Sequence, residues 1–180
     1  MMKRSILKFL GLMAVMAVAA CDVTQTTEVV APQADVLVTD YRWTPVLSSS
    51  ATTTTTVVQV VGRSGGTITN GANSLIVPAY AVLEDTEFRF TMVGDGTIHA
   101  SLTARSVASG VEVTAFPRPV MLRMSYAGAM VSNPSALSIA WLVDGTVDGA
   151  QVKQTSWVTT YNKSVNAYLY HFSDYAMGLE

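Results

Sequence analysis

Short runs in which apolar and polar residues alternate fill the chain after residue 57, and they limit its fold more than any other feature. In the clearest run, Ile98, Ala100 and Leu102 alternate with polar residues such as His99. Successive side chains of a strand point to opposite faces, so this period of two indicates strands with one buried face. Similar runs cover residues 88–92, 120–126, 137–143 and 165–172.

Turn signals separate these runs at short intervals. They are Gly65-Gly66, Asn70-Gly71, Gly94-Asp95-Gly96, Ser109-Gly110, Asn133-Pro134, Asp144-Gly145 and Asp148-Gly149. After residue 21 no stretch of helical period is long enough for a buried helix. The pattern predicts an all-β fold over residues 57–180, and uneven strand lengths favour an antiparallel β-sandwich over a barrel.

The first 20 residues have the composition of a secretory signal. Lys3, Arg4 and Lys8 are followed by an apolar stretch over residues 9–17 and by the small residues 18–20. This stretch is short for a membrane-spanning helix, so residues 1–20 are predicted to be a signal peptide. If they are removed, 8 basic residues remain against 13 acidic ones, a net charge of −5. Such a chain is poorly suited to nucleic acid.

The signal segment ends at Cys21, the chain's one cysteine, so no intramolecular disulfide can form. Val18-Ala19-Ala20-Cys21 resembles the lipobox of bacterial lipoproteins. The resemblance implies a diacylglycerol on the Cys21 thiol, cleavage just before it, and a lipid anchor on the outer side of a bacterial membrane. An ordinary signal peptide with a chance cysteine is the alternative. Whether the inner or the outer membrane holds the anchor stays open.

Residues 21–56 differ in composition from the alternating region. They include a Thr-rich start at 24–27, Ser48-Ser49-Ser50 and a Thr run at 52–56. Polar tracts bury too little apolar surface to offset chain entropy, so this range is predicted to be a flexible tether. One part of it, residues 36–43, could pair with the domain as an edge strand.

Several motifs in one order resemble the ZU-five domain of zonula occludens proteins, netrin receptors and ankyrins. They are Gly65 to Thr69, Ser74 to Ala81, Glu84-Asp85-Thr86, Phe116 to Leu122 and His171 to Ala176. The resemblance implies a β-sandwich that makes protein contacts and holds no cofactor. Tyr80 stands where that family's bend usually has Gly, which would cost free energy if the position needs φ > 0.

His171-Phe172-Ser173 carries a specific chemical hypothesis. In a few ZU-five relatives such a triplet cleaves its own backbone between Phe and Ser. In a strand, His171 and Ser173 would share a face, and Ser173 could attack a strained peptide bond while His171 moves the proton. The alternative, which we favour, is a partly buried histidine and a turn serine without chemistry.

Aromatic residues give the remaining candidate site. Tyr168 and Tyr170 lie opposite Leu169 and form either an exposed binding surface or a second buried layer. Trp141 shares its face with aliphatic residues and is expected in the core. His99 is expected to be solvated, and with two histidines in all no metal site is predicted.

These observations predict a membrane-anchored surface lipoprotein acting as a structural or protein/glycan interaction module and not as an enzyme. The alternative is a self-processing domain that cleaves once, between Phe172 and Ser173. No cofactor and no nucleic acid are expected, and the partner is an unidentified envelope protein or glycan.

Overall fold

The computed structural model describes residues 43–180, and nearly all of their regular structure is β-strand. Residues 1–42, which include Cys21, the predicted signal peptide and the predicted edge strand up to residue 42, lie outside the described part. The strands are β1 Thr44–Pro45, β2 Thr55–Val61, β3 Gly66–Asn70, β4 Asn73–Val77, β5 Thr86–Val93, β6 His99–Ser106, β7 Val120–Ser125, β8 Leu137–Leu142, β9 Gln151–Lys153, β10 Ser156–Thr159, β11 Ser164–Leu169 and β12 Asp174–Leu179. A short 3-10 turn covers Pro134–Ala136. Within residues 43–180 no helix is long and apolar enough to span a bilayer.

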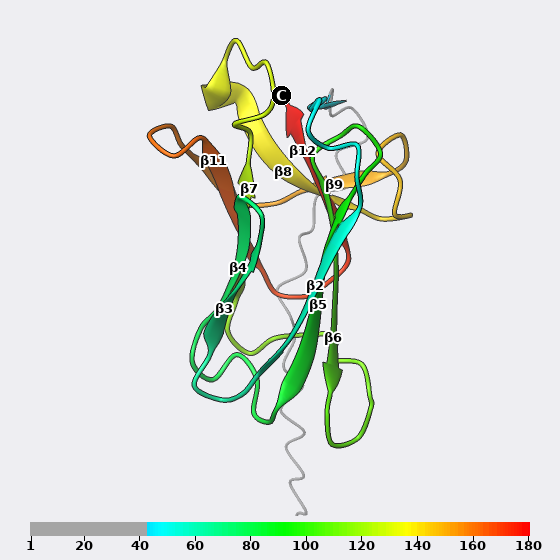
Figure 1. The fold of residues 1–180 in the computed structure, drawn as a ribbon, viewed down its shortest axis with the longest axis vertical. Helices are drawn as coiled ribbons and strands as arrows, with labels where there is room; N and C mark the ends of the chain where they lie inside the picture. The colour runs from blue at the N-terminus through cyan, green and yellow to red at the C-terminus, as the bar shows by residue number, and fades with distance from the viewer. Residues whose placement is uncertain (1–42) are drawn as a thin grey trace, which may run out of the picture.

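Two antiparallel sheets face each other (Figure 1), which confirms the predicted β-sandwich. The larger sheet has seven strands in the order β2-β5-β6-β12-β8-β9, with β1 also paired to β12. The smaller sheet has five strands in the order β10-β11-β7-β4-β3.

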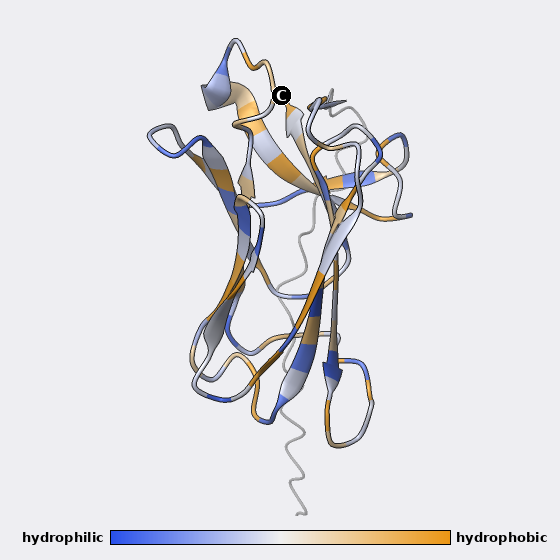
Figure 2. Cartoon of the chain, viewed as in Figure 1, coloured by the Kyte–Doolittle hydropathy of each residue, from blue (hydrophilic) through white to orange (hydrophobic). Residues whose placement is uncertain are grey.

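The core between the sheets contains the apolar residues of the alternating runs. In β5, Phe88 and Phe90 are fully buried, while Arg89 between them is exposed. Hydrophobic and hydrophilic residues alternate visibly along this strand (Figure 2). The same alternation holds in β7, where Val120, Leu122 and Met124 are fully buried. Burial of these side chains is the main favourable contribution to folding.

The folded region begins earlier than the sequence suggested, so the tether boundary at residue 56 needs correction. Trp43 and Val46 are buried, β1 pairs with β12, and the Ser48 N–H donates to the Gly96 carbonyl over 2.9 Å. Trp43 packs with Ala140, Leu142 and Ala176 on the outer side of the larger sheet. Residues 43–56 are therefore part of the domain, because the buried side chains of Trp43 and Val46 hold this mostly polar segment against it.

His99 is another correction, since it is 5% exposed and not solvated. Its Nδ1 lies 2.8 Å from Asp95 Oδ2, and its Nε2 lies 3.6 Å from Asp174 Oδ1. Burial of Asp95 opposes its ionisation, but hydrogen bonds from Thr97 and His99 outweigh this effect and lower its pKa. His99 is thus enclosed on this face of β6 between the side chains of Asp95 and Asp174.

Candidate functional site

The triplet His171-Phe172-Ser173 does not lie in a strand, contrary to the expectation of one long strand through residue 171. β11 ends at Leu169 and β12 begins at Asp174, so the triplet forms the connection between the two sheets. Phe172 points into the core, where its ring lies 5.6 Å from that of Phe88 and 4.6 Å from that of Phe116. This aromatic cluster fixes the connection and explains why the alternation continues past the strand.

His171 and Ser173 both contact the indole of Trp141, as their spacing predicted for residues on one side of the chain. Trp141 Nε1–H donates to Ser173 Oγ over 2.9 Å, and the imidazole lies edge-on to the indole with 4.7 Å between ring centroids. Trp141 is only partly buried, at the border of the core.

Four polar atoms of the triplet have partners other than those that self-cleavage requires: Ser173 Oγ, His171 Nδ1 and the carbonyls of His171 and Ser173. The Tyr175 hydroxyl donates to the His171 carbonyl over 2.8 Å and lies 3.3 Å from His171 Nδ1. The Ser173 carbonyl accepts the Leu102 N–H. Within residues 43–180 no hydrogen bond joins the His171 ring to Ser173. Neither Phe172 nor Ser173 has a positive φ or a cis peptide bond, so no backbone strain of these kinds lies at the bond.

Burial is the main factor that shifts the ionisation of this region. It lowers the pKa of His171 below its ordinary value, an effect only partly offset by a hydrogen bond to the backbone of Phe172. Burial, together with the charge of Asp174, raises the pKa of Tyr175. A neutral imidazole can accept a proton, but here its Nδ1 faces the Tyr175 hydroxyl.

The other predicted site, around Tyr168, is an exposed aromatic pair on the outer face of the five-stranded sheet. The rings of Tyr168 and Trp157 lie 5.0 Å apart and are 47% and 39% exposed. Tyr170 is also exposed, at 37%, but it lies beyond the end of β11. In the described part of the chain it has no ring contact with Tyr168 or Trp157, so the predicted pair of tyrosines is replaced by Tyr168 with Trp157.

Polar side chains lie beside this pair because of the strand register. Trp157, Asn166 and Arg123 occupy neighbouring positions across β10, β11 and β7. Asn166 is buried, its Oδ1 accepts a bond from Arg123 Nε over 3.4 Å, and its Nδ2 donates to Thr159 Oγ1 over 3.0 Å. The amide therefore bonds Arg123 on the same outer face of the sheet as the two rings. The sequence shows each strand's alternation but not which strands pair, so it could not place Arg123 here.

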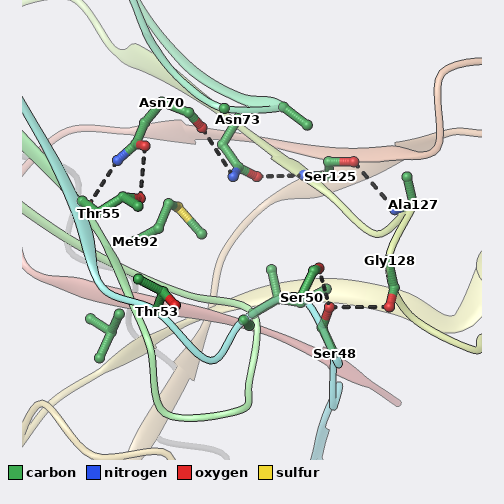
Figure 3. Close-up of a pocket in the computed structure, with 15 residues that line it drawn as sticks. Ser48, Ser50, Thr53, Thr55, Asn70, Asn73, Met92, Ser125, Ala127 and Gly128 are labelled. Atoms are coloured by element: carbon green, nitrogen blue, oxygen red, sulfur yellow. Dashed lines mark hydrogen bonds between the residues drawn. The ribbon is translucent and has the colours of Figure 1, made fainter.

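A pocket of about 440 Å³ opens at one end of the sandwich, between the segment before β2, the β3–β4 turn and the residues that follow β7 (Figure 3). Its polar lining includes Ser48, Ser50, Asn70 and Asn73, and none of the lining residues is charged. Most of these groups bond to one another or to the backbone: Ser48 Oγ lies 2.9 Å from Ser50 Oγ and donates to the Gly128 carbonyl. Mutual bonding of this kind indicates a structural closure of the sandwich end.

The described residues contain no cluster of side chains suited to bind a metal ion. No group of three or more His, Cys, Asp or Glu side chains among residues 43–180 is placed to hold an ion. His99 lies between Asp95 and Asp174, and its ring is buried.

No family model and no curated protein matches this chain.

Proposed function

We propose that this chain is a lipid-anchored binding module of the bacterial envelope that uses the outer face of its five-stranded sheet to bind a glycan. The contact between Trp157 and Tyr168 carries the proposal, because two large rings stay partly exposed on a regular strand surface. Aromatic rings are usually buried in a core, and an exposed pair is costly unless it serves recognition.

The composition of this face favours a glycan over a protein partner. The rings offer apolar faces for the C–H groups of a sugar, and Arg123 on the same sheet face offers donors for its hydroxyls. On the same outer face, Thr67 and Thr69 of β3 are exposed and Met121 of β7 is partly exposed. A protein interface of standard size would need a larger apolar centre than this single pair.

Anchoring through Cys21 is the second part of the proposal, and it rests on the lipobox-like sequence. Several acyl chains, each contributing about 0.8 kcal/mol per buried methylene, make attachment lasting. A Cys21→Ala chain is expected in the soluble fraction of its host, whereas the wild-type chain is expected in the membrane fraction with mass added at Cys21.

Affinity electrophoresis through gels containing soluble β-glucan, xylan or partially hydrolysed chitin tests the glycan face. At least one polysaccharide should retard the full chain, and Trp157→Ala and Tyr168→Ala should each weaken retardation about tenfold, since a stacked ring contributes on the order of 1–2 kcal/mol. Tyr161→Ala is the matched control: Tyr161 is 88% exposed at the tip of the β10–β11 hairpin and makes no ring contact with the pair. Equal effects of Tyr161→Ala and Trp157→Ala would contradict the proposal.

A further inference from the structure

Tyr80 has a backbone conformation that a tyrosine rarely adopts. Its φ is +65°, in the left-handed region where a side chain on Cβ crowds the backbone. This conformation is strained for a residue with a Cβ, and strain of this kind concentrates at functional positions. Lys163 has φ +49°, but it ends the four-residue loop of the β10–β11 hairpin, where that conformation is common.

The backbone around Tyr80 explains how the strain persists. The Tyr80 N–H donates to the Arg63 carbonyl over 2.8 Å, so the loop after β4 is bonded to the turn after β2. Gly65 in that turn packs against the backbone of Val77, Pro78 and Ala79, where an added Cβ would collide. The hydrogen bond and the close packing between the two turns hold the Tyr80 backbone in this conformation despite its strain.

The guanidinium groups of two arginines lie over the Tyr80 ring. The guanidinium carbons of Arg63 and Arg118 lie 5.8 and 5.5 Å from the ring centroid, and Arg118 also donates to the Ala79 carbonyl. Each contact has the geometry of a cation–π interaction. Tyr80 is 52% exposed, and both arginines are exposed.

Among the described residues, neither arginine lies within ion-pair distance of a carboxylate. Asp85, in the same loop as Tyr80, has its carboxylate close to Gly62, the residue before Arg63, without forming an ion pair with the guanidinium. Both guanidinium groups are exposed, and the N–H fork of an arginine matches a carboxylate in geometry and charge, so this end of the sandwich offers donors to an arriving oxyanion.

The neighbouring loops indicate what kind of molecule brings the oxyanion. Exposed apolar side chains lie on the loops at the same end of the sandwich: Leu83, Val107 and Val111 are 67%, 56% and 63% exposed. The Val107 N–H donates to the Asp85 carbonyl, which joins the two loops. Apolar groups next to paired arginines complement a peptide that carries both carboxylates and aliphatic side chains.

We propose that Arg63, Tyr80 and Arg118 form a second binding site, which holds a carboxylate of an acidic, partly apolar protein segment. This site lies at the end of the sandwich opposite the chain entry at Trp43, because β2 runs from the entry end to the turn that contains Arg63. It does not depend on the glycan face, which is on a sheet surface.

Fluorescence anisotropy with a labelled peptide that repeats Glu-Leu-Glu-Gly tests the site on the full chain, carrying Cys21→Ser to avoid acylation. The double variant Arg63→Gln, Arg118→Gln should weaken binding about tenfold, since it removes both exposed ion pairs with the peptide's carboxylates. Tyr80→Gly should weaken it about threefold through loss of the cation–π contacts, and Tyr80→Phe should leave it unchanged. Added salt should weaken binding to the wild type more than to the double variant.

The controls separate this site from a general effect of charge. Arg89→Gln with Arg105→Gln removes the same charge from the larger sheet and should leave peptide affinity unchanged. A twin peptide with Gln in place of Glu should not bind. The proposal is overturned if the wild type binds neither peptide, if the control variant weakens binding equally, or if Arg63 and Arg118 are needed for phosphatidylglycerol vesicles and not for the peptide.

Discussion

Trp141 Nε1–H donates to Ser173 Oγ over 2.9 Å, so the hydroxyl that a self-cleaving triplet would use as its nucleophile is bonded to an indole of β8. The indole donor is satisfied by a side chain from the connection that leads into β12. The serine thus has a structural partner, and the histidine two residues earlier contacts the same indole from its edge.

Replacing Ser173 by Ala is expected to change stability and not chain length. The Trp141 N–H loses its acceptor, which costs about 1 kcal/mol of unfolding free energy. Urea unfolding measures this cost, and Ser49→Ala, at an exposed position without a side-chain hydrogen bond, is the control. Intact mass after denaturation checks the chain: a fragment ending at Phe172 that disappears in the Ser173→Ala chain would establish self-cleavage instead.

Acid should weaken the fold through His171. Burial lowers the folded-state pKa of this residue below 6.5, so the folded state favours the neutral ring and the unfolded state binds a proton more readily. This contribution to stability is complete above pH 6.5 and is lost as the pH falls through the folded-state pKa. Unfolding curves between about pH 4 and 8 should show a decline in the wild type that His171→Asn lacks. Parallel pH profiles for the two chains would contradict this assignment, since His99 is unchanged in both.

Gly178→Ala should displace Trp43 from the larger sheet. A Cβ at Gly178 would overlap the indole of Trp43, which packs directly on that backbone. The expected cost is about 1–3 kcal/mol of unfolding free energy, as for other overpacked sites. Gly66→Ala is the matched control, because the new methyl would meet Val61 at an ordinary contact distance of 3.5 Å. In the Trp43→Ala background the Gly178→Ala cost should shrink, and full additivity of the two changes would show that they do not interact.

Alternation along the sequence predicted β5, β6, β7, β8 and β11, but it marked neither β9 nor β10, and it did not predict the contacts between distant segments. Alternation in residues 88–92 or 120–126 follows from strand geometry, which is local, so the burial of Phe88 and Leu122 could be anticipated. Trp43 lies in a polar stretch, and its docking depends on a glycine at the far end of the chain. Nothing local distinguishes such a residue from one in a tether.

The candidate sites show the same difference between local patterns, which the sequence reveals, and contacts between distant segments, which it does not. The sequence placed Tyr168 on the face opposite Leu169 but left open whether that face is exposed, and the contact of Tyr168 with Trp157 depends on the register of β10 with β11. Tyr80 was marked only because it replaces a usual glycine. Its two arginines come from turns that are separate in sequence, and the closure of the sandwich end brings them together.

The positive φ of Tyr80 can be tested by comparing its Gly and Ala variants, because at this φ the usual stability advantage of Ala over Gly is reversed. At a position with negative φ, Ala is more stable than Gly by about 0.5–1 kcal/mol. At φ +65° the Cβ of Ala keeps the strain and Gly removes it, so Tyr80→Gly should unfold at higher urea than Tyr80→Ala. Leu83, in the same loop and without a positive φ, should show the usual order for its Gly and Ala variants. If both positions rank Ala above Gly, Tyr80 is not strained, and the argument that its strain is retained for binding loses its physical basis.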